Sequence, residues 1–204
     1  MADAGLLMAH EAVTGVILAG GLGRRMGGVD KGLQLLAGRP LVRHVVDRLA
    51  PQVDAVLINA NRSKAEYGAL GYPVLADEIP DFAGPLAGLH AALSAARTPL
   101  VLTVPCDSPY LPPDLAARLY AGLVASGADL AIVRADGRLH PVFCLARTPL
   151  QASLAAYLEQ GGRRVAGWCS EMGACEVDFD DQPLAFRNFN TLDDLSINAD
   201  RTNA

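Results

Sequence analysis

Short apolar runs alternate along this chain with segments in which apolar residues recur every three or four positions. The short runs are rich in Val, Leu and Ile and carry few charges, which is typical of strands covered on both faces. We therefore predict strands at residues 14–19, 55–59, 73–76, 100–104, 130–133 and 142–145.

The intervening segments have the spacing of helices with one buried face. Leu41, Val45 and Leu49 follow this spacing, and Pro51 ends their segment. Strands and helices alternate closely, so we predict an α/β protein, a three-layer α/β/α sandwich with a mostly parallel sheet. Further helices are predicted at residues 86–93, 115–123 and 149–160, and a last one begins at Thr191, which has the character of an N-cap.

Other features indicate how these elements are organised. Residues 100–104 form the most strand-like segment, and we expect them at the centre of the sheet. Asp136-Gly137 is typical of a turn, and it would join the strands on either side of it. The sequence is more irregular between Gly161 and Asn190. Neither a repeat nor a linker divides the chain, so we expect one domain over residues 1–204 with its core at about 13–195.

Composition narrows the classes of partner. Of the 204 residues, 51% are hydrophobic but only 5% are aromatic, which fits a core of aliphatic side chains. The formal net charge is −5 and the isoelectric point is about 5.3. An acidic protein has little general affinity for nucleic acid or for an anionic membrane surface, so we expect neither as a partner.

Cysteine usage and the N-terminal segment bear on the compartment. The four cysteines form no Cys-x-x-Cys pair, and no histidine lies at zinc-finger spacing from them. The first eleven residues lack the basic start of a signal peptide, and no apolar run reaches transmembrane length. We therefore expect reduced thiols and a cytoplasmic protein.

The strongest functional signal is the segment Leu18–Lys31, which reads LAGGLGRRMGGVDK and follows the first predicted strand. A glycine-rich turn in this place exposes backbone N–H groups that can surround an anion, and its arginines and lysine add positive charge. The segment matches neither the G-x-G-x-x-G dinucleotide motif nor the Gly-Lys-Ser/Thr of a Walker loop. We interpret it as a loop for a nucleotide triphosphate; the alternative is a tight turn with solvated basic residues.

Polar residues follow three other predicted strands, at Asn59, Asp77 and Asp107. The carboxyl ends of parallel strands converge at one edge of a sheet, so these residues predict a nucleotide cleft there. Asp107 could hold Mg²⁺ against a phosphate, because Mg²⁺ takes one or two carboxylates plus phosphate oxygens. An Asx-turn before Pro109 is the alternative.

Asn59 and Asp77 suit the recognition of a base or a ribose. Guanine presents two neighbouring N–H donors, and a carboxylate or a carbonyl can accept both. Ordinary turns at strand ends are the alternative. Near the C-terminus, Asn188 and Asn190 would place two amides on one side of an extended segment, where they could hold a polar heterocycle or form a turn and a cap.

Taken in order, these motifs resemble the molybdenum cofactor guanylyltransferase family from about Thr14 to Leu195. The resemblance implies a Rossmann-like nucleotidyltransferase fold. It also implies Mg²⁺ dependence and a reaction of GTP with molybdenum-molybdopterin that yields the guanine dinucleotide cofactor and pyrophosphate. The matching motifs are LAGGLGRRMGGVDKG, GRPL, NAN, Asp77, GPLAG, PCDSPYLPPDL, HPVF and RNFNTLDDL.

The resemblance further implies roles for single residues. Asp107 would contact both the nucleotide and Mg²⁺, Lys31 would contact phosphate, and Arg25 would stabilise the leaving pyrophosphate. Phe189 departs from the small aliphatic residue that the family more often has. The remaining implied contacts are to GTP, from Leu18, Ala19, Gly20, Gly21, Asn59 and Asp77, and to the pterin, from Asn188 and Asn190.

Other functions stay open at this point. The LAGG and PCD forms favour GTP, but a CTP-dependent molybdopterin cytidylyltransferase or another nucleotidyltransferase has similar motifs. A non-catalytic carrier of GTP and the cofactor is a further alternative. The resemblance also implies a monomer that makes transient contacts with proteins that insert molybdenum and mature molybdoenzymes.

Overall fold

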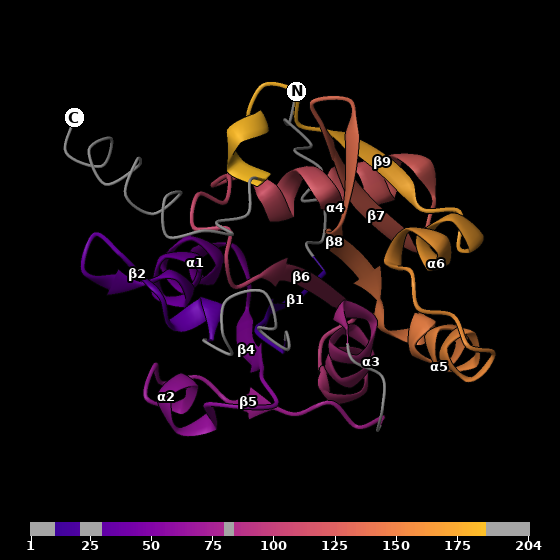
Figure 1. Cartoon of the computed structure of the whole chain (residues 1–204). Coiled ribbons are helices and arrows are strands. Elements are labelled where there is room, and N and C mark those ends of the chain that lie inside the picture. Colours follow the sequence, from indigo (N-terminus) through magenta and orange to yellow (C-terminus); the bar gives the residue numbers. More distant parts are fainter. Residues whose placement is uncertain (1–10, 21–29, 80–83, 187–204) are drawn as a thin grey trace, which may run out of the picture.

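The computed structural model describes residues 11–20, 30–79 and 84–186, and within them a seven-stranded sheet forms the centre of the molecule. The strand order is β5-β4-β1-β6-β8-β7-β9, which Figure 1 shows running from β5 at the bottom to β9 at the upper right. All neighbours pair in parallel except around β8, which is antiparallel to both β6 and β7. The strands are β1 (Val13–Leu18), β4 (Ala55–Asn59), β5 (Val74–Leu75), β6 (Leu100–Pro105), β7 (Leu130–Ala135), β8 (Arg138–Arg147) and β9 (Cys175–Asp178).

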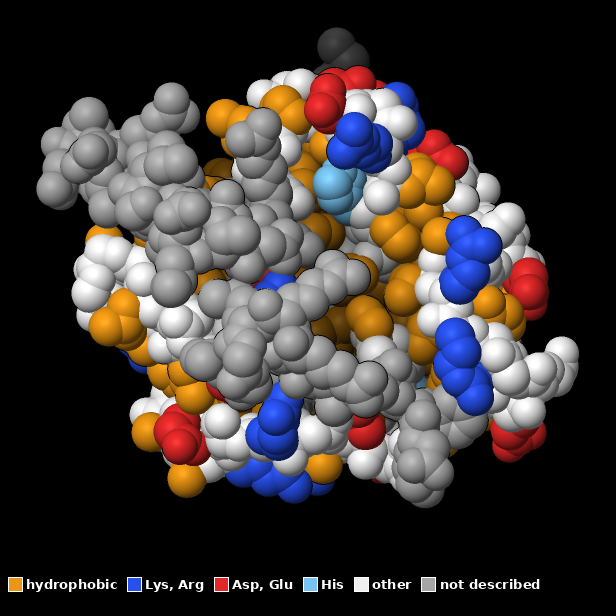
Figure 2. Space-filling view, in the orientation of Figure 1, with side chains coloured by type: hydrophobic (Ala, Val, Ile, Leu, Met, Phe, Trp, Pro, Cys, Tyr) orange, Lys and Arg blue, Asp and Glu red, His pale blue; other side chains and the backbone are white. Residues whose placement is uncertain are grey.

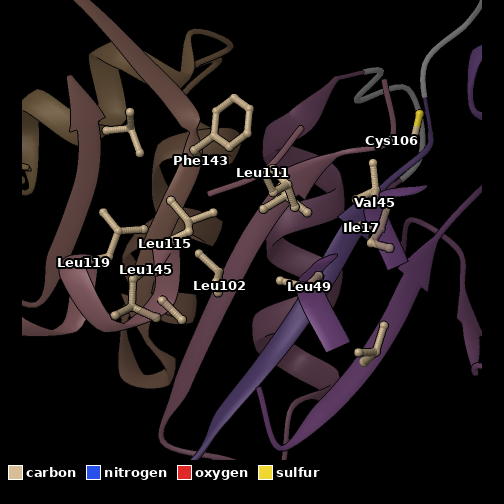
Figure 3. Close-up of a cluster of buried hydrophobic side chains, with 14 of the residues drawn as sticks. Ile17, Val45, Leu49, Leu102, Cys106, Leu111, Leu115, Leu119, Phe143 and Leu145 are labelled. Carbon is tan, nitrogen blue, oxygen red and sulfur yellow. The ribbon is translucent and has the colours of Figure 1, made fainter. Parts of the chain in front are cut away.

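Helices cover both faces of this sheet. The helices α1 (Leu41–Leu49) and α4 (Leu115–Ser126) pack in one apolar cluster with residues of the sheet, whereas α3 (Pro85–Ala95), α5 (Gln151–Glu159) and α6 (Val165–Glu171) pack in a second. In the first cluster, Figure 3 shows Ile17 of β1 on the side of Val45 and Leu49 of α1, and Leu102 of β6 toward Leu115 of α4. The three-layer α/β/α sandwich with a mostly parallel sheet is thus confirmed.

The hairpin between β7 and β8 and the central position of β6 are confirmed as well. Asp136 and Gly137 have φ angles of 52° and 64°, as a two-residue turn of type I′ requires. The sheet order places β6 fourth of seven strands. Pro141 lies where the register between β7 and β8 shifts, since a proline has no N–H to give to the ladder.

Several short elements were not expected from the sequence. The region predicted to be irregular contains α6 and β9, and the 3₁₀ segment η5 (Pro183–Phe186) follows them. A small hairpin of β2 (Leu35–Leu36) and β3 (Arg39–Pro40) precedes α1, and α2 (Lys64–Gly68) follows β4. Three further 3₁₀ segments are η2 (Lys31–Leu33), η3 (Ala50–Gln52) and η4 (Thr148–Leu150). The helix predicted after Thr191 lies outside the described residues.

On the face of the molecule that Figure 2 shows, Lys and Arg side chains of the described residues are interspersed with Asp and Glu. None of the helices formed by the described residues combines the length and the apolar character needed to cross a membrane.

Candidate active site

The carboxyl ends of β4, β1 and β6 lie in line at one edge of the sheet. Leu18 of β1 pairs with Asn59 of β4 on one side and with Pro105 of β6 on the other. The backbone continues this alignment, because Ala19 N donates to Asn59 O at 2.8 Å and Cys106 N donates to Leu18 O at 3.1 Å. The residues that leave these strands therefore start from one shared edge, as the sequence predicted.

One group of side chains at this edge is a hydrogen-bonded cluster of two amides and a carboxylate. Asn59, which is only 2% exposed, donates from Nδ2 to Asp77 Oδ1 at 2.9 Å. Asn61 donates from Nδ2 to Asp77 Oδ2 at 2.7 Å, and its Oδ1 accepts from the backbone N of Asp77 at 2.9 Å. Both oxygens of Asp77 are therefore oriented by an amide.

Asn61 was missed as a candidate site residue. It stands two positions after Asn59, and that alternate spacing in Asn59-Ala60-Asn61 is the signal that could have found it. The same spacing pointed to Asn188 and Asn190 near the C-terminus.

Two glycines come close to this cluster because neither carries a side chain. A Cβ on Gly20 would lie 3.2 Å from Asn59 Oδ1 and 3.4 Å from Asn61 Nδ2. A Cβ on Gly88, in α3, would lie 2.4 Å from Asn59 Oδ1 and 2.9 Å from Leu18 Cδ2. The first turns of α3 are thus packed against the ends of β1 and β4 at the level of the cluster.

A charged pair forms the second group. Lys31 Nζ lies 3.5 Å from Asp107 Oδ2, although 76 positions separate them in the chain. The side chain of Asp107 is 10% exposed and that of Lys31 is 29% exposed. Burial raises the pKa of the Asp107 carboxyl above its ordinary value, and the nearby ammonium of Lys31 opposes part of that effect.

The donor set at Asp107 fits a metal that is shared with a substrate. Within residues 11–20, 30–79 and 84–186, no three His, Cys, Asp or Glu side chains gather in a way that could hold a metal ion by themselves. Asp107 supplies one hard oxygen ligand in a largely dry setting. Mg²⁺ commonly binds in this way, through one or two carboxylates and the phosphates of a nucleotide.

Seven of the predicted site residues lie at or beside this edge of the sheet. Leu18, Ala19, Gly20, Lys31, Asn59, Asp77 and Asp107 all lie in the described segments at or beside this edge. The other predicted site residues, Gly21, Arg25, Asn188 and Asn190, lie outside the described residues, as does Phe189.

Comparisons with known proteins place the chain among transferases. A family model described as "MobA-like NTP transferase domain" matches residues 15–172. The molybdenum cofactor guanylyltransferase of Cupriavidus necator is 52% identical over 194 residues, covering 93% of this chain and 97% of that relative.

Two solved structures share the fold. The molybdopterin-guanine dinucleotide biosynthesis protein A from Archaeoglobus fulgidus superposes with a TM-score of 0.76 at 24% identity, covering 93% of this chain and 98% of that one. A Mycobacterium tuberculosis protein in complex with manganese has a TM-score of 0.67 at 19% identity, covering 93% and 98%.

An open, mostly parallel sheet with this polar edge, together with the matching family model, defines a nucleotidyltransferase. Within that class, the chain belongs to the molybdenum cofactor guanylyltransferase family.

Proposed function

We propose that this protein transfers GMP from GTP to the terminal phosphate of molybdenum-molybdopterin, forming the molybdenum guanine dinucleotide cofactor and releasing pyrophosphate. The observation that carries the proposal is the shared sheet edge. There, the Lys31–Asp107 pair provides charges for phosphates, and the Asn59–Asp77–Asn61 cluster provides acceptors and donors for a base and a ribose. The identity to the guanylyltransferase of Cupriavidus necator supports the choice of substrates.

Recognition of guanosine falls to the amide and carboxylate cluster. Each carboxylate oxygen has more than one lone pair, so Asp77 can accept from the N–H donors of guanine while it still accepts from Asn59 and Asn61. Leu18, Ala19, Gly20 and Gly21 would hold the nucleotide through backbone groups. Cytosine lacks the pair of neighbouring donors, and an acceptor that a bound nucleotide covers without pairing costs affinity for CTP.

Catalysis would consist of positioning and charge stabilisation. The attacking phosphate oxygen of the acceptor is already an anion, so no strong general base is needed for attack at the α-phosphorus of GTP. Lys31 and Arg25 would stabilise the negative charge that moves onto the departing pyrophosphate. Asp107 would hold a divalent cation, which we assign as Mg²⁺; when bound, the cation neutralises phosphate charge.

The acceptor side completes the proposal. Asn188 and Asn190 would hold the pterin through their amides. We place the reaction in the cytoplasm, in a monomeric protein that contacts molybdenum-insertion and molybdoenzyme maturation proteins transiently.

The test is product analysis after incubation of the purified protein with GTP, Mg²⁺ and molybdenum-molybdopterin. We expect pyrophosphate and the guanine dinucleotide in equal amounts, and a loss of about 10²–10³-fold in rate for Asp107→Ala. Parallel reactions with CTP and with sugar phosphates separate this activity from other nucleotidyltransferases. Tight binding of GTP and the pterin without turnover would instead indicate a carrier, and would contradict the proposal.

A further inference from the structure

Tyr67 places a polar group inside the core next to the candidate active site. It lies on α2, its side chain is fully buried at 0% exposure, and it belongs to the apolar cluster that also contains residues of α1 and β4. Its hydroxyl donates a hydrogen bond to Asp30 Oδ1, 37 positions away. Asp30 immediately precedes Lys31, so this contact anchors the chain one residue before the lysine of the Lys31–Asp107 pair.

The backbone just after Lys31 is confined between the same tyrosine and the residue before Asp107. A Cβ on Gly32 would lie 2.5 Å from Tyr67 Oη and 3.2 Å from both Cβ and Sγ of Cys106. Cys106 is itself buried at 8% exposure. The residues on both sides of Lys31, Asp30 and Gly32, therefore lie against Tyr67. Cys106, which also lies close to Gly32, immediately precedes Asp107.

The chemistry of the hydroxyl explains why a tyrosine stands here rather than a phenylalanine. A buried hydroxyl without a partner costs free energy, whereas Phe fills nearly the same volume without that cost. Burial also raises the pKa of the Tyr67 phenol well above its ordinary range, so the group keeps its proton and acts as a donor at any working pH. The hydroxyl thus serves the contact with Asp30 rather than packing alone.

We propose that Tyr67 is a positioning residue for the transfer reaction: through Asp30 and Gly32 it fixes Lys31 at its separation from Asp107. The inference rests on the proposed function of Lys31 and Asp107. Because the transition state redistributes charge over the phosphates, a small displacement of Lys31 affects the chemical step more than the binding of GTP.

The first test compares Tyr67→Phe with Tyr72→Phe, a control that removes a hydroxyl from a tyrosine packed at the border of the same cluster. We expect Tyr67→Phe to lower kcat about 10- to 100-fold, the loss typical of a misplaced catalytic group, while KM for GTP changes less than about threefold. Tyr72→Phe should retain wild-type kinetics. A folded Tyr67→Phe with kcat within about twofold of wild type would overturn the inference.

A second set of variants acts on Asp30, outside the apolar cluster. Asp30→Asn keeps an oxygen that can accept from Tyr67 and should retain most of the kcat, whereas Asp30→Ala should match Tyr67→Phe. The double variant Tyr67→Phe/Asp30→Ala should be no slower than either single variant, because both remove one contact. Additive losses would contradict the inference. An inactive wild-type protein would instead refute the proposed function, so the two failures are distinguishable.

Discussion

Asp107 shows at the scale of one residue how a functional group is kept in a place that costs folding free energy. Its side chain is 10% exposed, and burial raises the pKa of its carboxyl even though Lys31 lies 3.5 Å away. An ionised carboxylate in such a place is less stable than it would be in water, and further positive charge would stabilise it. In the proposed reaction that charge is supplied by the cation bound with the nucleotide. The free protein is therefore less stable because it holds the Asp107 carboxylate in the place where the cation would bind.

We therefore predict that Asp107→Asn stabilises the free protein at neutral pH while it slows transfer about 10²–10³-fold. A carboxyl with a raised folded pKa favours folding below its unfolded value, near 3.8, and loses that contribution as the pH rises through the folded pKa. Asn mimics the protonated form, so we expect the Tm at pH 7 to rise by about 2 °C. The gain should shrink as the pH falls toward 3.8.

Thermal unfolding at several pH values measures this effect. Asp47→Asn is the matched control, because Asp47 is an exposed carboxylate paired with Arg39 and Arg43 on the surface. Removing the charge of Asp47 should leave the Tm unchanged or slightly lower. A lower Tm for Asp107→Asn at pH 7 would show that the buried carboxylate stabilises the fold, and would contradict this prediction.

At the scale of elements, the site depends on how closely α3 packs onto the ends of β1 and β4. The helix predicted at residues 86–93 is α3, which begins at Pro85. The spacing of apolar residues in α3 could not predict that Gly88 lies against Asn59, because the two residues belong to different elements. Helical periodicity identifies which face is buried but not what lies against it.

Gly88→Ala should therefore damage both stability and nucleotide binding. Its Cβ would lie 2.4 Å from Asn59 Oδ1, so either α3 or the Asn59–Asp77 hydrogen bond must shift. We expect a loss of about 1–3 kcal/mol in the free energy of unfolding and at least about tenfold weaker GTP binding. Gly68→Ala in α2 is the control, since a Cβ there meets nothing within 4 Å and should be neutral or slightly stabilising.

Urea unfolding and calorimetric titration with GTP provide the two measurements. Wild-type affinity in a stable Gly88→Ala protein would mean that α3 does not constrain the guanosine side of the site.

The edge strand β9 was missed for a related reason. Its four residues alternate between half-buried and exposed positions and form no apolar run. It becomes a strand because Val177 packs where Gly122 of α4 leaves room, with Val177 Cγ2 only 2.4 Å from the place of a Cβ, and because it pairs with β7. Both the packing and the pairing join β9 to residues far away in the sequence. The local sequence pattern of β9 therefore does not predict a strand.

At the scale of the whole molecule, the proposed function joins two halves of one sheet edge. The cluster at Asp77 belongs to the side of β4 and β5, and Asp107 follows the central strand β6. GTP that contacts both would bind only the folded protein. Binding should therefore appear as a gain in the stability of the entire chain.

We predict that GTP with Mg²⁺, at about 100 times its Kd, stabilises the fold by about 2.7 kcal/mol and raises the Tm by about 5–10 °C. CTP at the same concentration should give a clearly smaller shift, and Asn59→Ala should reduce the response to GTP. Differential scanning fluorimetry with each nucleotide measures these shifts. Equal shifts with GTP and CTP would contradict the assignment of Asn59 and Asp77 to the guanine base.

The sequence by itself determined the layered α/β architecture, the hairpin at Asp136-Gly137 and the polar residues that end the strands. These features follow from the period of the apolar residues and from local turn chemistry, both of which lie within a few neighbouring positions. Only the tertiary structure decided which of these polar side chains meet. Asn61 donates a hydrogen bond to Asp77, and Tyr67 donates one to Asp30. Lys31 forms an ion pair with Asp107. Such contacts join residues 16 to 76 positions apart, and the packing of elements, rather than any local preference, brings them together.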